Sequence, residues 1–379
     1  MPQRLRPFLW PFVVLLVAAA GYAIVLARTG EFVDFAVPYR AATRFLAHEP
    51  LYRPADGHYQ FKYFPAFAAV MVPFTVMPKP VAEVVWFGLT ILMAWAFVRM
   101  SVNALPARRQ HVTTLVWLAL LLNGKFLVKE LGMGQFNLPL GLLLLSAVIA
   151  AQRRQELLAG ALVAAGVFVK PYALVLVPWL AWTQGWRALT MFAVVIAIGL
   201  AIPIVSYGWD GNLTLLQDWY RTVRDTTAPN LMARETISFE SMWARWLEPG
   251  SLASRLAMIT SIAAVAAGSI AIARRRSVAE PNYLEVAYFL TFIPLISPQG
   301  WDYVMLLALP TYVLLVDRYR DMTTPWRAVT IVGFILTSFA IYDLMRRSVY
   351  FFVMDWSGPA IGAVLMAATL IHLRWRALA

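Results

Sequence analysis

The sequence predicts an all-α polytopic membrane protein, a bundle of about twelve transmembrane helices. Hydrophobic residues make up 61% of the 379 positions and charged residues 14%, against about 45–50% and about 25% in soluble domains. The apolar runs are continuous and helical in length, whereas a β-barrel would show short alternating segments. Arginines fall in short clusters between these runs, as in loops that flank membrane helices.

The apolar runs place the membrane-spanning helices in chain order. The first run, from Phe8 to Ala27, has about 20 residues and exceeds the roughly 7–15 of a signal-peptide core, so we expect a retained first helix. Lys170-Pro171 separates two short runs, which form either one kinked helix or a hairpin of half-helices. The predicted spans cover residues 8–27, 80–99, 112–128, 137–151, 157–169, 172–183, 188–206, 252–273, 283–296, 302–316, 328–344 and 358–373.

The arginine clusters predict the orientation. They share one side of the membrane only if 157–183 crosses twice, and the positive-inside rule makes that side cytoplasmic. We therefore expect a single integral-membrane domain with both termini in the cytoplasm. Its long outer loops are expected at about 28–79 and 207–251, and short outer turns at 297–301 and 345–357. The clusters are Arg4/Arg6, Arg99/Arg108/Arg109, Arg153/Arg154, Arg187, Arg274/Arg275/Arg276, Arg318/Arg320/Arg327 and Arg374/Arg376.

The acidic residues favour chemistry on the outer face. Of the 20 acidic residues, only a few fall inside with this topology. Those few are Glu156, Glu280, Glu285, Asp317 and Asp321. The remaining carboxylates are therefore expected in the outer loops or near that face of the membrane.

Motifs for several other chemistries are missing from the sequence. The four histidines share no metal-ligand spacing, and the chain has no cysteine. Asn123-Gly124-Lys125 lacks the remaining residues of a phosphate-binding loop, and no Asp-x-Asp pair occurs to hold a metal-bound nucleotide. We expect neither a metal nor a cofactor. The net charge of +12 follows from the arginine clusters, so the expected partner is the lipid bilayer and not nucleic acid.

The first outer loop, from Asp34 to Pro65, is the first long polar stretch of the chain. Its start, residues 34–48, has apolar residues on one helical stripe and arginines four apart on another, as in a helix lying in the membrane interface. Residues 66–77 are too short to span, so they re-enter or lie flat. Asp34 at the helix start suits a general base for an acceptor hydroxyl. Alternatively, it caps the helix, since Asp is a favoured N-cap, or it is an aspartate at the membrane interface without a catalytic role.

Landmarks along the chain carry a family resemblance. They are Asp34-Phe35, Tyr39, Ala41-Ala42, Pro50-Leu51-Tyr52, Phe61-x-Tyr63-x-Pro65, Gly134-Gln135-Phe136-Asn137, Ala159-Gly160 with Lys170, and Ser297-Pro298-x-x-Trp301. In this order, over about 34–303, they resemble family 87 of the membrane glycosyltransferases. That family belongs to the GT-C superfamily, typified by polyprenyl-phosphate-mannose-dependent mannosyltransferases of bacterial envelopes.

The resemblance implies a function and a set of roles. It implies a GT-C-like bundle in the bacterial inner membrane that transfers a sugar from a polyprenyl-phosphate donor to a glycan or glycolipid hydroxyl, inverting the anomeric centre. Asp34 would be the general base. Candidates for binding sugar or acceptor are Tyr39, Tyr63, Gln135, Asn137 and Asp302.

Departing phosphate needs positive charge as the glycosidic bond breaks. Candidates at the predicted outer face are Lys62, Lys129, Lys170, Arg234 and Arg245. An ionisable group between two short apolar helices is costly, which favours a functional Lys170. A lysine that snorkels at a helix end is the alternative. Gln135 and Asn137 similarly either bind sugar hydroxyls or only form a turn.

Two departures from the family pattern concern the substrate. Where relatives often carry Asn-Gln-Ser, this chain keeps only Ser241. Where they often carry a histidine after the Ser-Pro-x-x-Trp turn, it has Asp302, so either the donor differs or another basic residue supplies the charge. Two other functions stay open: a flippase or transporter for lipid-linked glycans, which would need a polar midplane path or matched broken helices, and an envelope polysaccharide polymerase.

Overall fold

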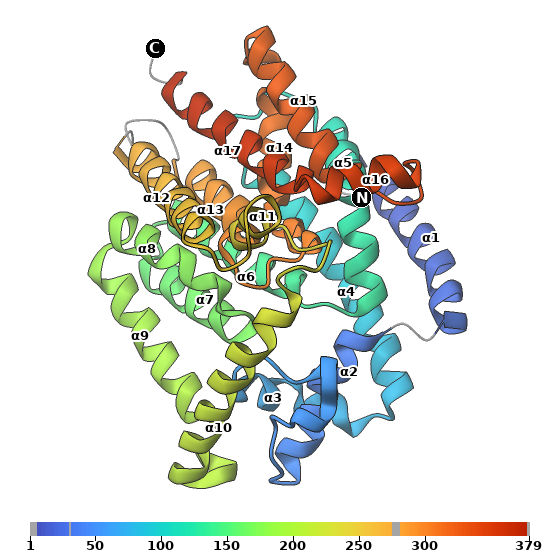
Figure 1. Cartoon of the computed structure of the whole chain (residues 1–379), viewed down its shortest axis with the longest axis vertical. Helices are drawn as coiled ribbons and strands as arrows, with labels where there is room; N and C mark the ends of the chain where they lie inside the picture. Colours follow the sequence, from blue (N-terminus) through green and yellow to red (C-terminus); the bar gives the residue numbers. More distant parts are fainter. Residues whose placement is uncertain (1–5, 30–31, 275–280, 377–379) are drawn as a thin grey trace. The chain divides into compact units, whose positions relative to one another are not determined.

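The computed structural model describes residues 6–29, 32–274 and 281–376. Every secondary-structure element longer than a single bridge in these ranges is a helix (Figure 1). The only strand-like pairing among them is an isolated antiparallel bridge between Thr236 and Trp301. The all-helical prediction is therefore confirmed. Four residues used to orient the chain, Arg4, Arg275, Arg276 and Glu280, lie outside the described ranges.

Helices occupy every predicted span. Five are long and apolar enough to cross a membrane: α1 (Arg6–Thr29), α4 (Lys79–Asn103), α5 (Val112–Met133), α12 (Leu252–Arg274) and α17 (Gly358–Arg376). A sixth candidate is the pair α9 (Gly185–Ala201) and α10 (Ile204–Thr227), which bends by 94° at a short break. The other predicted spans are shorter helices, so the number twelve remains a prediction.

The chain divides into two compact units. Three of the four boundaries between them fall inside α1, α4 and α5, and the fourth follows Ala228. One unit contains residues 12–96 and 128–228, and the other contains residues 1–11, 97–127 and 229–379. We call them the Asp34 unit and the Asp302 unit, after a predicted site residue in each. Each is described by itself.

The Asp34 unit contains the elements of the first predicted outer loop. These are α2 (Val33–Leu46), the 3₁₀ turn η2 (Pro54–Tyr59), α3 (Pro65–Met71) and η3 (Val72–Val76). The helix predicted at 34–48 is thus present, and it ends before Pro50 as expected for a segment approaching proline. Helix α2 packs against α3 and η3 through a face that buries Phe35, Ala42 and Phe45.

The Asp34 unit also contains a set of short apolar helices. They are α6 (Asn137–Gln152), α7 (Glu156–Val169), η4 (Pro171–Leu176), α8 (Val177–Thr183) and then α9. Lys170 has an extended backbone between α7 and η4, because the following proline disfavours a helical residue there. Helix α7 packs closely on α9 (Figure 1). A Cβ at Gly160 would lie 2.1 Å from the Ala188 carbonyl oxygen, so only glycine permits this approach.

The Asp302 unit is built around a buried helix. This helix, α13 (Asn282–Ile296), packs against α17, α14 (Leu309–Arg318) and the 3₁₀ segment η6 (Asp302–Ala308). Two large buried polar side chains inside the unit have partners there: the Tyr283 hydroxyl donates to the Ser101 carbonyl at 2.8 Å, and Arg374 donates to Glu285 at 2.8 Å. Helix α15 (Thr324–Ser338) packs along α17.

Two segments expected to be loops or turns contain helices. Residues 207–251 include most of α10 and all of α11 (Phe239–Trp246), and residues 345–357 include α16 (Arg347–Asp355). All three are amphipathic, so their apolar residues are too widely spaced to appear as an apolar run. Two short 3₁₀ turns, η5 (Ala228–Asn230) and η7 (Tyr319–Asp321), complete the described elements.

Candidate active site

Asp34 lies in the first turn of α2 and is not its N-cap. The N-cap is Phe32, which makes no side-chain capping bond. The alternative that Asp34 merely caps the helix is therefore wrong. The carboxylate is near a helix N-terminus, where the partial positive charge of the helix dipole favours an anion.

Ion pairs fold the following loop back over α2. Arg44 donates two hydrogen bonds to the Asp56 carboxylate, at 2.6 and 2.9 Å, which is the bidentate arrangement that fixes both groups. Arg40 donates to the Tyr59 carbonyl at 2.8 Å. Arg40 and Arg44, which the sequence places on one face of the helix, therefore both anchor η2. This anchoring holds η2 in place just before the chain reaches Lys62.

A glycine turn brings Gln135 to Asp34. Gly134 has φ +68°, a left-handed conformation that favours glycine. A Cβ at this position would lie 2.7 Å from the Phe35 Cβ, so the turn approaches α2 more closely than any other residue allows. As a result Gln135 Nε2 donates to the Asp34 carboxylate. The glycine explains how residues 101 positions apart meet.

Lys170 joins Gln135 to a second amide and a second carboxylate. Its Nζ donates to Gln135 Oε1 at 3.2 Å and to Asn137 Oδ1 at 2.8 Å. Asn137 Nδ2 in turn donates to Glu130 Oε2 at 2.8 Å, and the Leu138 amide donates to Glu130 Oε1 at 2.8 Å. Side chains therefore connect Asp34, Gln135, Lys170, Asn137 and Glu130 in that order, and we call this set the Asp34–Glu130 chain.

The contacts of the Asp34–Glu130 chain decide between earlier alternatives. Lys170 is directed inward to two amides, so it is not a snorkelling lysine. Gln135 and Asn137 are buried and hydrogen-bonded, so neither is only a turn residue. From the sequence, Glu130 is expected only in a structural ion pair with Lys125 or Lys129 and not in the site; its side chain is fully buried in α5. A buried carboxylate among apolar residues was the available signal, because such a group requires partners.

Burial and nearby charge act in opposite directions on Asp34. Burial raises the pKa of the Asp34 carboxyl, while Lys170, the hydrogen bond from Gln135, Lys62 and His58 lower it. Burial dominates, so the pKa is above its usual value. A carboxylate with a raised pKa is a stronger proton acceptor, which suits a general base.

Lys62 is the second cation near Asp34. Burial lowers the pKa of Lys62, and Asp34 opposes this shift. Among the described residues its ammonium makes no hydrogen bond or ion pair, which distinguishes it from Lys170. The Lys62 backbone is fixed instead: its carbonyl accepts from Trp219 Nε1 at 3.1 Å, and the adjacent Phe64 ring stacks on Trp219 at 4.0 Å. The segment is rigid while the charge remains available.

The two candidate tyrosines differ in their roles. Tyr39 donates its hydroxyl to the Met77 carbonyl at 2.9 Å, a bond that ties α2 to the end of η3. Tyr63 stacks on Phe67 with ring centroids 4.6 Å apart. Burial first, and Asp34 second, hold the pKa of Tyr63 well above its usual range, so this hydroxyl remains protonated beside the carboxylate.

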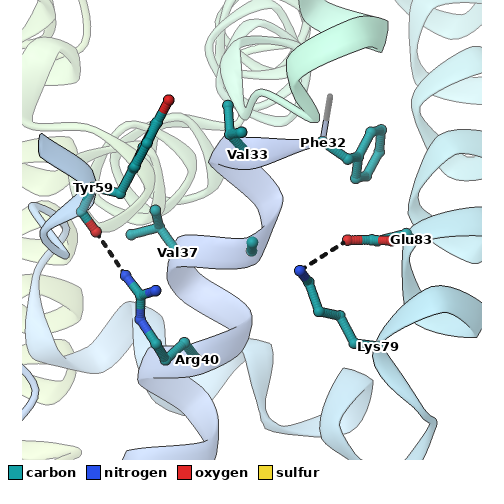
Figure 2. Close-up of a pocket in the computed structure, with 8 residues that line it drawn as sticks. Phe32, Val33, Val37, Arg40, Tyr59, Lys79 and Glu83 are labelled. Carbon is teal, nitrogen blue, oxygen red and sulfur yellow. Dashed lines mark hydrogen bonds and ion pairs between the residues drawn. The ribbon is translucent and has the colours of Figure 1, made fainter. Parts of the chain in front are cut away.

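A cavity of about 140 Å³ opens on the neighbouring face of α2 (Figure 2). Helical spacing of Val33, Val37 and Arg40 produces its α2 wall. Lys79 and Glu83 form an ion pair at 3.4 Å across from that wall. Its lining residues are Phe32, Val33, Ala36, Val37, Arg40, Tyr59, Lys79 and Glu83. Sequence reasoning did not identify this cavity, whose lining combines apolar and charged side chains.

The remaining candidates are not members of the Asp34–Glu130 chain. Lys129 is half-buried on α5, one residue before Glu130. Arg234 and Arg245 belong to the Asp302 unit, where Arg234 pairs with Asp355 at 2.9 Å. Arg245 donates to the carbonyls of residues 233, 234 and 236 at 2.6, 3.1 and 2.9 Å, so it braces the start of α11.

Asp302 is a buried ion-pair partner within its own unit. Its carboxylate lies 3.3 Å from Lys125 Nζ, and the two side chains are only 5% and 6% exposed. Lys125 Nζ also donates to the Ala340 carbonyl at 3.3 Å. A basic residue therefore accompanies the aspartate that stands where relatives often carry histidine. Within the described parts of the chain, no three His, Asp or Glu side chains form a group that could hold a metal ion.

The comparison with protein families identifies the class. Residues 61–298 match the model of glycosyltransferase family 87, which is more than half of the chain. The chain belongs to glycosyltransferase family 87. It is therefore a glycosyltransferase, and its long apolar helices indicate a multi-pass membrane protein. A search of curated proteins finds no match.

Proposed function

We propose that this protein transfers a sugar, with mannosyl-like specificity, from a polyprenyl-phosphate donor to an acceptor hydroxyl at the extracytoplasmic face of the bacterial inner membrane. Both termini then lie in the cytoplasm, and the acceptor is a glycan or glycolipid. One observation carries the proposal. A buried carboxylate, Asp34, lies close enough to Lys62 for each charge to influence the pKa of the other, and the Lys62 ammonium has no hydrogen-bonded partner among the described residues.

The reaction needs one proton acceptor and one phosphate stabiliser. The acceptor hydroxyl loses its proton to Asp34 as its oxygen forms a bond to the anomeric carbon. The bond from that carbon to the phosphate oxygen breaks, and its electron pair leaves with the polyprenyl phosphate. Attack opposite the leaving group inverts the anomeric centre.

Lys62 and Lys170 have different roles in this scheme. Lys62 stabilises the charge that develops on the phosphate, because its ammonium is available and lies near the base. Lys170 already donates to Gln135 and Asn137, so it positions the Gln135 amide that holds Asp34. Gln135 and Asn137 then act through Asp34 and Lys170. Tyr63 then remains as the candidate for contact with sugar hydroxyls.

The two other candidate functions receive less support. A flippase needs charged groups along a midplane path or matched broken helices, whereas Asp34, Lys170 and Glu130 are joined in one local hydrogen-bonded set. A polysaccharide polymerase that uses a lipid diphosphate would need more positive charge than one available lysine supplies. The family match also favours transfer chemistry over transport.

A donor panel tests the proposal. Purified protein in lipid nanodiscs is incubated with polyprenyl-phosphate sugars, polyprenyl-diphosphate sugars and nucleotide sugars, and glycosylated products are detected by mass shift. We expect turnover with the monophosphate donor and none with Asp34→Asn, which keeps an oxygen to accept from Gln135 but cannot take a proton. Turnover only with nucleotide sugar would contradict the proposed donor, and near-normal turnover of Asp34→Asn would contradict the base.

A further inference from the structure

Helix α10 follows the apolar helix α9, which lies in the span predicted at 188–206, and turns sharply away from it. Helix α9 is apolar, and its Val194 and Ile198 side chains are 44% and 59% exposed, as for a helix facing lipid. After a short break α10 departs at 94° to α9. Gly208, with φ +68°, completes the break, so the regular helix begins at Trp209. A helix perpendicular to a span lies parallel to the membrane plane.

Three kinds of side chain divide the surface of α10. One face is apolar and exposed: Trp209, Leu213 and Tyr220 are 66%, 43% and 61% exposed. At 100° per residue these three positions and Leu216 fall within about 60° of one another. The first and last are aromatic residues with a polar edge, the type enriched at membrane interfaces. We call this the Trp209 face.

A second face of α10 is polar and exposed. It carries Asp210, Thr214, Gln217 and Arg221, which fall within another sector of about 60°, roughly 100° from the Trp209 face. A third face packs inside the unit through the buried residues Asn212, Leu215 and Thr222. A helix on the surface of a soluble protein has two faces. Three faces match a helix with protein beside it, lipid below it and water above it.

We propose that α10 lies in the membrane interface, with the Trp209 face among lipid and the Gln217 side in water. The sharp bend from α9 and the three-way division of side chains carry this inference together. It concerns the bilayer as a partner and does not depend on the enzymatic activity.

The inner side of α10 connects this position to Lys62. Trp219 donates to the Lys62 carbonyl at 3.1 Å and stacks on Phe64, as described above. The interface is where phosphate groups of lipids lie. Helix α10 therefore holds Lys62 at the level of a lipid-linked phosphate, a step that rests on the proposed function.

The absence of cysteine from the sequence gives a native background for site-directed spin labels. Single variants on the Trp209 face are Trp209→Cys, Leu213→Cys and Tyr220→Cys. Matched variants are Thr214→Cys and Gln217→Cys on the polar face, and Val194→Cys and Ile198→Cys on α9. Depth is measured by power saturation with oxygen and a nickel chelate, in vesicles of phosphatidylcholine and phosphatidylglycerol without donor.

We expect one common depth for the three labels of the Trp209 face, with high oxygen and low nickel access. The polar-face labels should show high nickel access, and the α9 labels should differ in depth. If α10 crossed the membrane, the labels at 209 and 220 would differ in depth by about 16 Å. That result, or equal nickel access on both faces, would overturn the interfacial position.

The connection to Lys62 has a separate test. Trp219→Phe keeps a ring against Phe64 but removes the Nε1 donor, and Trp209→Phe makes the same change on the Trp209 face. Loss of one hydrogen bond predicts a roughly fivefold higher KM for the donor in Trp219→Phe and little change in Trp209→Phe. An unchanged KM in Trp219→Phe would contradict the connection. The depth measurement stands even if the donor assignment fails.

Discussion

Lys170 Nζ donates to Asn137 Oδ1 at 2.8 Å, and this bond determines which way the Asn137 amide faces. An ammonium only donates, so the amide oxygen must point to it and the Nδ2 group is left to donate to Glu130. Gln135 is oriented in the same way, with its Nε2 toward Asp34. One lysine thus directs two amides toward two carboxylates.

Glu130→Gln should lower kcat at least tenfold. The new amide can turn an N–H toward Asn137, which disturbs the Asn137 bond to Lys170, and hydrogen bonds to charged groups contribute about 1.5–3 kcal/mol. Single-turnover kinetics measures the change. Glu130→Asp keeps the charge and should recover part of the rate. Equal rates in wild type and Glu130→Gln, with folding confirmed by circular dichroism, would contradict a positioning role for Glu130.

The pH–rate profile should be bell-shaped. Asp34 must be ionised to accept a proton, and its raised pKa moves the acidic limb to higher pH. Lys62 must be charged, and its lowered pKa moves the alkaline limb to lower pH. Lys62→Arg should move the alkaline limb upward, because arginine remains protonated throughout the range. If the alkaline limb does not move in Lys62→Arg, a group other than Lys62 causes that limb.

Lys170→Met should move the acidic limb of the same profile. Lys170 is the largest of the charges that lower the Asp34 pKa, so its removal raises that pKa further. Activity should therefore be lost at a higher pH than in wild type. Lys170→Arg keeps the charge and is the matched control. A limb that moves to lower pH in Lys170→Met would show that Asp34 does not control it.

Asp34→Asn should raise the thermal midpoint at neutral pH while abolishing turnover. The folded-state pKa of Asp34 is raised above its unfolded value, so ionisation of this group disfavours the fold. No such cost exists below the unfolded pKa, and the full cost is present once the pH has risen through the folded pKa. The gain should therefore vanish in acid. A variant that melts lower than wild type at neutral pH would indicate a structural role.

Removing one partner of the Lys125–Asp302 pair should destabilise the protein by about 3–5 kcal/mol, because the other charge remains buried. The pair lies 3.3 Å apart with both side chains almost fully buried. Asp302→Asn and Lys125→Met are each expected to lower the thermal midpoint, and the double variant should recover part of the loss. Additive losses in the double-mutant cycle would show that the two side chains do not interact.

Gly134→Ala should weaken the contact between Gln135 and Asp34. The position has φ +68°, and the added Cβ would lie 2.7 Å from the Phe35 Cβ. Both effects shift the turn away from α2, so turnover and stability should fall together. Gly124→Ala is a matched control, since a Cβ there meets nothing within 4 Å. Comparison of initial rates and melting midpoints of the two variants measures the effect.

The sequence alone determined the helical class, the positions of the apolar helices and the family. Those features follow from long apolar runs, from Lys170-Pro171 as a break, and from short landmarks that a family model also matches. It also selected Asp34, Gln135, Asn137 and Lys170 as candidates, each for a separate reason. The spacing of these four residues along the chain gave no information about which of their side chains contact one another.

The tertiary structure decided the contacts and the faces. Asp34 and Gln135 are 101 positions apart, and a left-handed glycine turn brings them together. Glu130 acquired a role only through Asn137, and Asp302 acquired Lys125 as its partner. Helix α10 was not predicted from the sequence, because its apolar residues occupy only part of the helix surface and therefore do not form a continuous apolar run. The length of an apolar run can be read from neighbouring residues in the sequence. The partner of a hydrogen bond, and whether a helix face meets protein, lipid or water, depend on how the whole chain packs.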